Sequence, residues 1–132
     1  MDKVYLSWSD VEELVQTLAH RINDQLAGVK FIHGLERGGM IPAVMISHLL
    51  NIPYTHHPHY HPNECLIIDD ICDSGETLKR WSGHNTAVLH YKPHTSCCTP
   101  TIWVTTHDVD SWIIYPWEDR KSSTIQDYKL RQ

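Results

Sequence analysis

Apolar and polar positions along the chain predict helices and strands in alternation. From Val11 to Leu26 the apolar residues recur every three or four positions, which is the spacing of an amphipathic helix. Residues 9–12 (SDVE) match a capping box and place the start of this helix. Residues 29–34 are a short apolar run typical of a buried strand, and residues 41–50 predict a second helix with a proline in its first turn.

The second half of the chain continues this pattern with several short β-type runs. Residues 65–68 are apolar without interruption, as expected of a central strand that is covered on both faces. Three further strands are predicted at 87–91, 102–104 and 112–115. Because strands alternate with helices, we expect an α/β fold with a mostly parallel central sheet flanked by helices, in a single domain that spans residues 1–132.

The segment between the second helix and the central strand, residues 51–64, carries three prolines and four histidines. The prolines exclude a long helix or a central strand, so this segment is predicted to be a loop or an edge element. The histidines have two interpretations. They are either the polar side chains of an exposed loop or the ligands of a transition metal ion such as Zn²⁺.

Composition limits the classes of function. A formal net charge of -5 argues against a broad DNA- or RNA-binding surface. The apolar runs are far too short to cross a bilayer, and the first residues lack the apolar segment of a signal peptide, so we expect a cytoplasmic protein. The four cysteines lack zinc-ribbon spacing and are expected to be reduced.

The strongest candidate for chemistry is the segment that follows the central strand. Asp69 and Asp70 come directly after the apolar run, at the edge where open parallel sheets bind ligands. Residues 74–77 (SGET) then turn the chain into a helix, where backbone N–H groups and hydroxyls converge on a phosphate. Each part alone has an ordinary explanation as a solvated turn or a helix cap. Together they predict a site for a phosphorylated sugar.

This combined pattern resembles the ribose-phosphate signature of the type I phosphoribosyltransferases, which use 5-phosphoribosyl 1-pyrophosphate (PRPP) as sugar donor. Further segments resemble the 6-oxopurine branch, especially the bacterial xanthine-guanine enzymes: residues 6–8 (LSW), 37–42 (RGGMIP), 91–93 (YKP), 112–113 (WI) and 116–118 (PWE). The resemblance covers most of the chain. It implies the type I phosphoribosyltransferase fold and transfer of the phosphoribosyl group to guanine, xanthine or hypoxanthine, with release of pyrophosphate.

The resemblance also implies roles for individual residues. Asp73 would be the catalytic acid/base beside N7 of the purine, and Asp70 would contact a Mg²⁺ cofactor. The base-binding residues would be Asp73, Lys92, Trp112 and Ile113. The PRPP-binding residues would be Arg37, Gly38, Asp69, Asp70, Ile71, Cys72, Asp73, Ser74, Gly75, Glu76 and Thr77. The expected partners are PRPP and a 6-oxopurine, and the family resemblance favours a homo-oligomer, either a dimer or a tetramer.

One segment departs from the family pattern. The mobile loop that carries a basic residue over the pyrophosphate is usually longer, whereas here residues 52–64 contain neither Lys nor Arg, so the hood or flexible loop is reduced. One hypothesis is that the protonated loop histidines replace that charge. The alternative functions are a catalytically weak sensor of the same fold that binds PRPP or a nucleotide, and a partner-binding protein without donor affinity.

Overall fold

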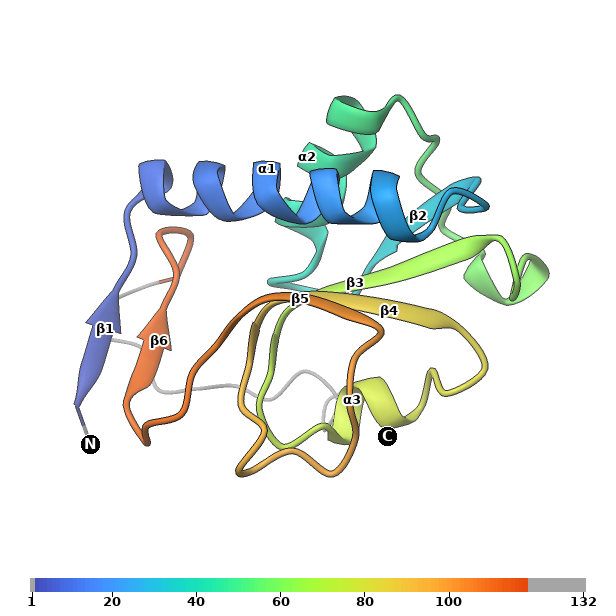
Figure 1. Ribbon diagram of the computed structural model, residues 1–132. Helices are drawn as coiled ribbons and strands as arrows, with labels where there is room; N and C mark the ends of the chain where they lie inside the picture. The colour runs from blue at the N-terminus through green and yellow to red at the C-terminus, as the bar shows by residue number, and fades with distance from the viewer. Residues whose placement is uncertain (1, 119–132) are drawn as a thin grey trace.

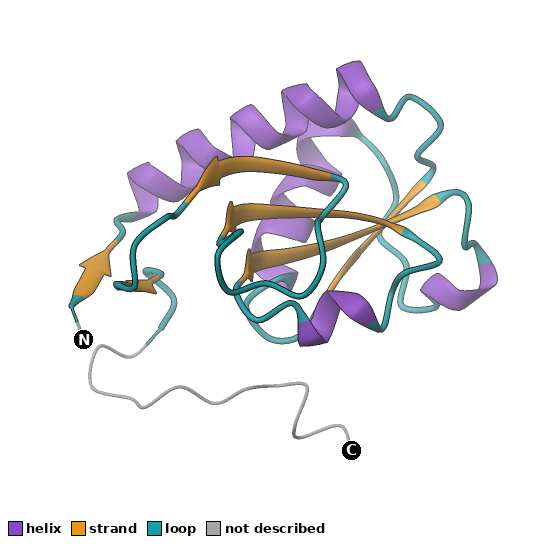
Figure 2. Ribbon diagram, turned by 60° about the horizontal axis from the view of Figure 1, so that its bottom comes forward, coloured by secondary structure: helices purple, strands orange, loops and turns teal. Residues whose placement is uncertain are grey.

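A four-stranded parallel sheet forms the centre of the computed structural model, which describes residues 2–118 (Figure 1). The strands are β2 (Phe31–Gly34), β3 (Cys65–Cys72), β4 (Asn85–Tyr91) and β5 (Ile102–Thr106), in the order β2-β3-β4-β5. Helices α1 (Trp8–Gln25) and α2 (Met40–Leu50) cover one face, and the short α3 (Glu76–Lys79) lies on the other (Figure 2). The predicted α/β fold is confirmed.

A second, two-stranded sheet lies beside the carboxyl ends of the central strands (Figures 1 and 2). Strand β1 (Lys3–Tyr5) pairs in parallel with β6 (Trp112–Ile114), with Val4 opposite Ile113. No strand-to-strand ladder joins this β1–β6 sheet to the central one within residues 2–118. Side chains therefore set how it sits on the central sheet.

The apolar run in β3 is buried on both faces, as the sequence predicts. Leu66 and Ile68 pack in the core between the sheet and helices α1 and α2. Ile67, between them, packs on the opposite face with Leu78 of α3 and Val88 of β4. The three residues are fully buried, so one strand ties both layers to the sheet.

Helix α1 begins two residues earlier than the sequence predicts. Its N-cap is Ser7, whose hydroxyl accepts a hydrogen bond from the Asp10 amide at 3.0 Å. The Asp10 carboxylate in turn accepts one from the Ser7 amide at 2.8 Å. This is a complete capping box over residues 7–10, so the predicted box at residues 9–12 is wrong: Ser9 already lies inside the first helical turn.

Strand β3 is longer than the apolar run at residues 65–68 predicts. The ladder with β4 continues past Ile68, pairing Asp69 with Val88 and Cys72 with Tyr91. The two acids are thus part of the strand rather than of a turn after it. Because a paired strand has a fixed backbone, their carboxylates start from defined positions.

Residues 51–64 wrap around the edge of β2 and confirm the prediction of a loop or edge element. Tyr54 forms a parallel bridge with Ile32, and a 3₁₀ turn follows at Pro58–Tyr60. His59 stacks on Trp81 with ring centroids 4.8 Å apart, and His61 stacks on Phe31 at 4.1 Å.

Phe31 begins β2 and Trp81 precedes β4, so His59 and His61 lie at the amino ends of the strands, opposite the β1–β6 sheet (Figure 2). This position contradicts the hypothesis that these two histidines close over the pyrophosphate. Residues 2–118 contain no group of three His, Cys, Asp or Glu side chains arranged to hold a metal ion, so the metal interpretation gains no support there.

All four cysteines are free thiols. Among the described residues, no helix is both long and apolar enough to cross a bilayer. The polar tail from residue 121 to 132 lies outside the described residues.

Candidate active site

The residues predicted to bind PRPP and the purine gather where β2, β3 and β4 end. The loop after β2 carries Arg37 and Gly38, and the turn after β4 begins with Lys92. Residues 69–77 run from the carboxyl-terminal half of β3 into α3. Strand β6 of the neighbouring sheet supplies Trp112 and Ile113. The carboxyl ends of parallel strands meet at one edge, which is why residues far apart in sequence come together here.

The glycine loop after β2 lies directly against the acid pair. A Cβ atom added to Gly38 would overlap the Asp70 carboxylate, with its carbon only 2.9 Å away. A Cβ added to Gly39 would lie 2.8 Å from the Asp69 Cα and 2.5 Å from the carbonyl oxygen of Ile68. The Leu35 amide donates to that same carbonyl at 2.9 Å. Only glycine permits so close an approach of loop and strand.

Asp70 is a desolvated carboxylate. Its Oδ1 accepts a hydrogen bond from the Ile71 amide at 2.8 Å, and Asp69 Oδ1 accepts one from the Asp70 amide at 2.9 Å. Burial raises the pKa of Asp70 to about 6, and the negative charge of Glu118 acts in the same direction. A carboxylate whose charged form is disfavoured in this way favours the arrival of a cation.

These acids fit a Mg²⁺ ion that enters with its substrate. Residues 2–118 offer no protein-only cage of three ligands. Mg²⁺, however, typically uses one or two carboxylates and takes its other ligands from phosphate oxygens and water. Asp70 therefore stays the predicted metal contact.

The 5′-phosphate loop is a tight turn supported from one side. Gly75 has a φ of 84°, in the left-handed region, and a Cβ added there would lie 2.6 Å from the Ser96 hydroxyl. The Cys97 amide donates to the Ser74 carbonyl at 2.8 Å, and the Ser74 hydroxyl accepts from the Glu76 amide at 3.3 Å. The support from residues 96–98 was not predicted, because nothing local in that segment indicates its long-range contact with this loop.

Asp73 and Lys92 form the centre of the candidate base site. Their charged groups are 3.6 Å apart, and the Lys92 ammonium also donates to the Ser111 carbonyl at 3.1 Å. Thr95 donates its hydroxyl proton to Asp73 Oδ1 at 2.9 Å. Lys92 is only 5% exposed. A lysine that is so buried requires a partner, and Asp73 and the Ser111 carbonyl provide it. Thr95 and Ser111 were not predicted.

Three of the predicted residues offer only their backbone to this edge. The Ile113 side chain is buried in the main core cluster, and that of Ile71 packs against it. The Cys72 thiol is buried, 3.1 Å from the Ser96 hydroxyl. Trp112 is half-buried, and the Lys3 ammonium lies 6.0 Å from its ring centroid.

A buried tyrosine that the sequence analysis did not single out links the acids to β4. The Tyr115 hydroxyl donates to the main-chain carbonyl of Asp70 at 3.1 Å and lies 2.8 Å from His90 Nδ1. Burial, with a smaller contribution from His107, lowers the pKa of His90 to about 4. The signal in the sequence was a tyrosine at a predicted core position, because a buried phenol needs a partner.

This low pKa predicts an acid-sensitive protein. His90 stays neutral in the fold but binds a proton in the unfolded chain below about pH 6.5, so folding stability falls by roughly 3 kcal/mol as the pH drops from 6.5 to 4. His90→Phe cannot titrate there. In urea unfolding at pH 7 and pH 4.5, we expect the wild type's advantage over this variant to shrink by about 2 kcal/mol. An equal advantage at both pH values would contradict the assignment.

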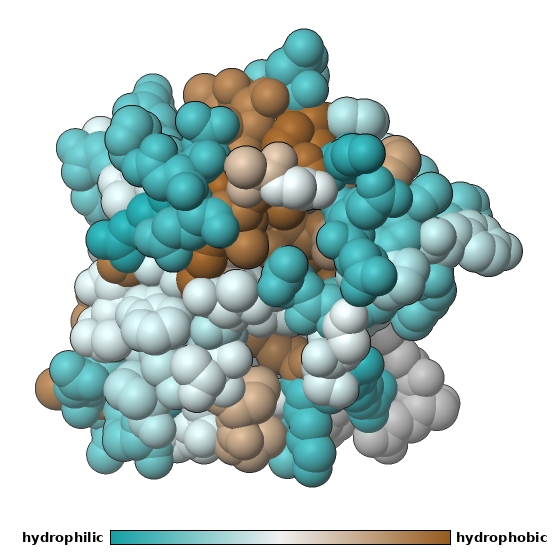
Figure 3. Space-filling view, turned by 45° about the vertical axis from the view of Figure 1, so that its right-hand side comes forward, coloured by the Kyte–Doolittle hydropathy of each residue, from teal (hydrophilic) through white to brown (hydrophobic). Residues whose placement is uncertain are grey.

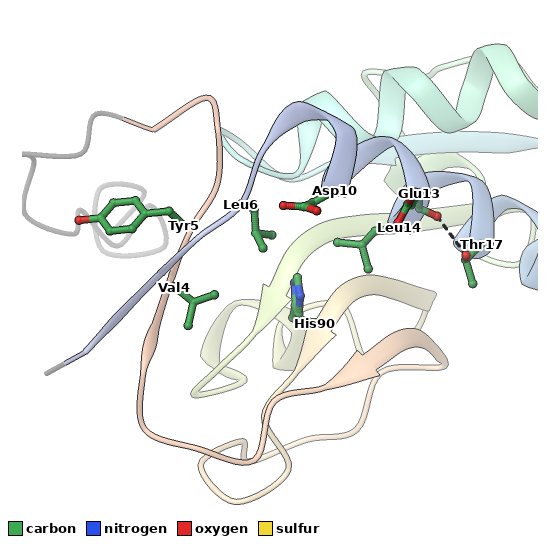
Figure 4. A pocket seen from close by; sticks show the side chains of 8 residues that line it. All are labelled: Val4, Tyr5, Leu6, Asp10, Glu13, Leu14, Thr17 and His90. Atoms are coloured by element: carbon green, nitrogen blue, oxygen red, sulfur yellow. Dashed lines mark hydrogen bonds between the residues drawn. The ribbon is translucent and has the colours of Figure 1, made fainter.

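An open pocket of about 490 Å³ lies away from these acids, between β1, helix α1 and β4 (Figure 4). Its walls include Leu6, Leu14 and the ring of His90. It shares only His90 with the network just described, so it is not the predicted PRPP site.

Comparison with known proteins identifies the fold. No family model matches the chain. A purine phosphoribosyltransferase structure from Pyrococcus horikoshii is 28% identical, with a TM-score of 0.74 over 96% of this chain and 99% of that one. The xanthine-guanine phosphoribosyltransferase of Cereibacter sphaeroides is 25% identical over an alignment of 157 positions, gaps included. The alignment covers 96% of this chain and 93% of that protein. The chain has the type I phosphoribosyltransferase fold, and the relatives that it resembles in sequence are purine phosphoribosyltransferases, which are enzymes.

A third structure agrees with this phosphoribosyltransferase fold. The xanthine-guanine-hypoxanthine phosphoribosyltransferase of Helicobacter pylori has a TM-score of 0.75 over 88% of this chain and 93% of its own, at 18% identity. The resemblance predicted from residues 69–77 is thereby confirmed. The roles of the individual site residues stay predictions.

Proposed function

We propose that this phosphoribosyltransferase transfers the 5-phosphoribosyl group of PRPP to guanine, xanthine or hypoxanthine and releases pyrophosphate. The observation that carries the proposal is the buried Lys92, which lies 3.6 Å from Asp73 and is bonded to the residue preceding β6. This arrangement provides a hydrogen-bond donor for a purine 6-oxygen next to a carboxylate for its imidazole edge. The similarity to xanthine-guanine enzymes supports the same substrate class.

In the proposed reaction a purine nitrogen replaces pyrophosphate at the anomeric carbon of the sugar. Asp73 would exchange a proton with N7, and Lys92 would donate to O6 and so select oxo over amino purines. Asp69 and Asp70 would face the ribose hydroxyls, while the amides of residues 74–77 would hold the 5′-phosphate. The Arg37–Gly38 loop would bind the pyrophosphate. Mg²⁺, when bound, would neutralise the charge that develops on the leaving group.

A single assay tests this proposal. The protein is incubated with PRPP, Mg²⁺ and, in turn, guanine, xanthine, hypoxanthine and adenine, and the nucleotides are separated by chromatography. We expect a monophosphate product from at least one oxopurine and none from adenine. Absence of product from every base would contradict the proposal.

The alternative is a sensor that binds PRPP or a nucleotide without efficient turnover. Residues 52–64 favour this second candidate, because they contain no Lys or Arg and their His59 and His61 pack at the opposite edge of the sheet. Calorimetry distinguishes the two: tight PRPP binding in Mg²⁺ without product indicates the sensor. The cytoplasmic location stays an expectation from the sequence.

We also propose that two copies of the chain associate through helix α2. This helix is apolar on nearly all sides, yet Val44 is 43% and Leu49 is 53% exposed. Such a helix is normally buried. An apolar patch is visible on the side of the molecule that carries α2 (Figure 3).

Sedimentation velocity tests this interface. The wild type is expected to sediment as a dimer or larger at micromolar concentration, and Leu49→Glu as a monomer. Val109→Glu is the matched control, since Val109 is 59% exposed but lies outside α2. A monomeric wild type, or equal masses for all three proteins, would contradict the proposal.

A further inference from the structure

The β1–β6 sheet is held against the central sheet by the apolar packing of Ile113 and Tyr115 in the main core and by a few polar side-chain contacts. No strand ladder joins the two sheets within residues 2–118. Lys92 donates to the Ser111 carbonyl, and His107 Nε2 lies 2.8 Å from the Ser111 hydroxyl. Tyr115, the residue after β6, supplies the other connection, to Asp70 of β3. Lys92 already has a proposed role toward the base. Tyr115 is only 2% exposed and is buried in the core, so it is the contact whose role is still unassigned.

The direction of the hydrogen bonds around Tyr115 follows from chemistry. A main-chain carbonyl can only accept, so the phenol proton goes to the Asp70 carbonyl. The phenol oxygen must then accept from His90, whose Nδ1 therefore carries a proton. The chain of donors runs from β4 through Tyr115 to β3. The side chains of His90 and Tyr115 are buried, and His90 Nδ1 loses its hydrogen-bond partner if the phenol hydroxyl is removed.

Ring packing holds the tyrosine in this position. Trp117 stacks on Tyr115 with centroids 4.9 Å apart and an interplanar angle of 3°, and Trp117 in turn contacts Trp8 at 5.9 Å. On the other side, the His90 ring extends from β4 toward Leu6 and Leu14 (Figure 4). Tyr115 is thus fixed relative to α1, β4 and β6 together.

We propose that Tyr115, held by His90, is a positioning residue that sets the place of β6, which carries the predicted base-binding residues Trp112 and Ile113, relative to the donor site on β3. This inference rests on the proposed function for its meaning in catalysis. In the reaction, the anomeric carbon above Asp70 and the purine beside Trp112 must meet at bonding distance, and displacements of about 1 Å are enough to slow such steps. Tyr115 touches neither reactant. It acts through the backbone of Asp70.

The test compares Tyr115→Phe with Tyr91→Phe. Tyr91 is an equally suitable buried tyrosine, 8% exposed, whose hydroxyl lies 3.3 Å from that of Thr99 on the opposite face of the sheet. Both substitutions remove one hydroxyl from the core. Hydrogen exchange followed by mass spectrometry then reports how firmly residues 111–116 are held, without any ligand.

We expect exchange in residues 111–116 to become about tenfold faster in Tyr115→Phe, because one buried hydrogen bond that holds this segment is lost. In Tyr91→Phe the exchange of the same residues should change less than twofold. His90→Asn, which keeps an amide N–H near the position of Nδ1, should exchange like the wild type, and His90→Leu like Tyr115→Phe. Equal exchange in the two Phe variants would overturn the proposal.

Ligand binding provides the second readout. Guanosine 5′-monophosphate spans both sites, whereas ribose 5-phosphate occupies the donor side alone. In Tyr115→Phe, the affinity for the nucleotide should fall about tenfold, and that for ribose 5-phosphate less than twofold. Equal losses of affinity for the two ligands would indicate a local effect on Asp69 and Asp70 and would overturn the proposed positioning role. If the wild type binds neither ligand, the proposed function fails, and the exchange experiment still decides the role of Tyr115.

Discussion

Replacing Asp73 with asparagine is expected to lower kcat about 1000-fold, within the range found for loss of a general acid or base, while the affinity for PRPP stays within about threefold. Asparagine keeps an oxygen for the Thr95 hydroxyl but cannot exchange a proton with the purine. It also removes the negative charge beside the Lys92 ammonium. Turnover is measured by product formation and donor affinity by calorimetry in Mg²⁺.

The matched control for this variant is Asp110→Asn. Asp110 is exposed and pairs with His94 at 3.1 Å, so the substitution makes the same chemical change nearby without touching the candidate base site. Its kcat should equal that of the wild type within a factor of two. If Asp73→Asn retained more than a tenth of the wild-type kcat, the acid/base role would be wrong. Equal losses in the two variants would show a general charge effect.

Replacing Gly38 with alanine is expected to weaken PRPP binding at least 100-fold, because the new methyl group takes the space of the Asp70 carboxylate. Either that carboxylate or the pyrophosphate loop must move, and both belong to the proposed donor site. Two effects reduce the binding free energy of PRPP: a charged contact shifts by several tenths of an ångström, and the loop no longer approaches the strand closely. Together they cost about 3 kcal/mol, which corresponds to the 100-fold loss. Calorimetry with PRPP and Mg²⁺ measures the effect.

Gly83→Ala is the control for the glycine loop. Nothing lies within 4 Å of a Cβ at Gly83, so this variant adds the same methyl group in open space. We expect its donor affinity and melting temperature to match those of the wild type. Tight donor binding by Gly38→Ala with an intact fold would show that the loop after β2 is not part of the donor site.

The sequence predicted the parts of the fold that depend on local patterns. The apolar run at residues 65–68 is buried on both faces, as its composition requires. The role of the loop around Arg37 and Gly38 was implied by the family resemblance, and its close approach to Asp69 and Asp70 agrees with that role. The burial of residues 65–68 needed only neighbouring residues.

The features that were missed depend on long-range pairing. Strand β1 has three exposed residues and exists because it meets β6, more than 100 positions away. The helix cap was predicted at Ser9 instead of Ser7 because each serine has an acid three residues later, Glu12 and Asp10 respectively. Only the backbone geometry distinguishes the two. The positions of His59 and His61 depend on stacking with Trp81 and Phe31, respectively. No local sequence pattern predicts these ring contacts.

The candidate site shows the same division. Asp73, Lys92 and the phosphate loop follow from the family pattern, but their supports do not. Ser111 bonds Lys92 and Tyr115 bonds the carbonyl of Asp70. These two residues flank β6, and no local sequence pattern indicates where β6 packs against the central sheet. Sequence reasoning finds groups that meet a ligand more readily than groups that hold those groups in place.

A crystal structure with guanosine 5′-monophosphate tests the central claim most directly, namely that the sugar-phosphate and purine sites share the edge formed by β2, β3, β4 and β6. The account predicts the phosphate on the amides of residues 74–77, the ribose beside Asp69 and Asp70, and the purine O6 within hydrogen-bond distance of the Lys92 ammonium. A nucleotide bound in the pocket beside Leu14, or a phosphate away from Gly75, would contradict it.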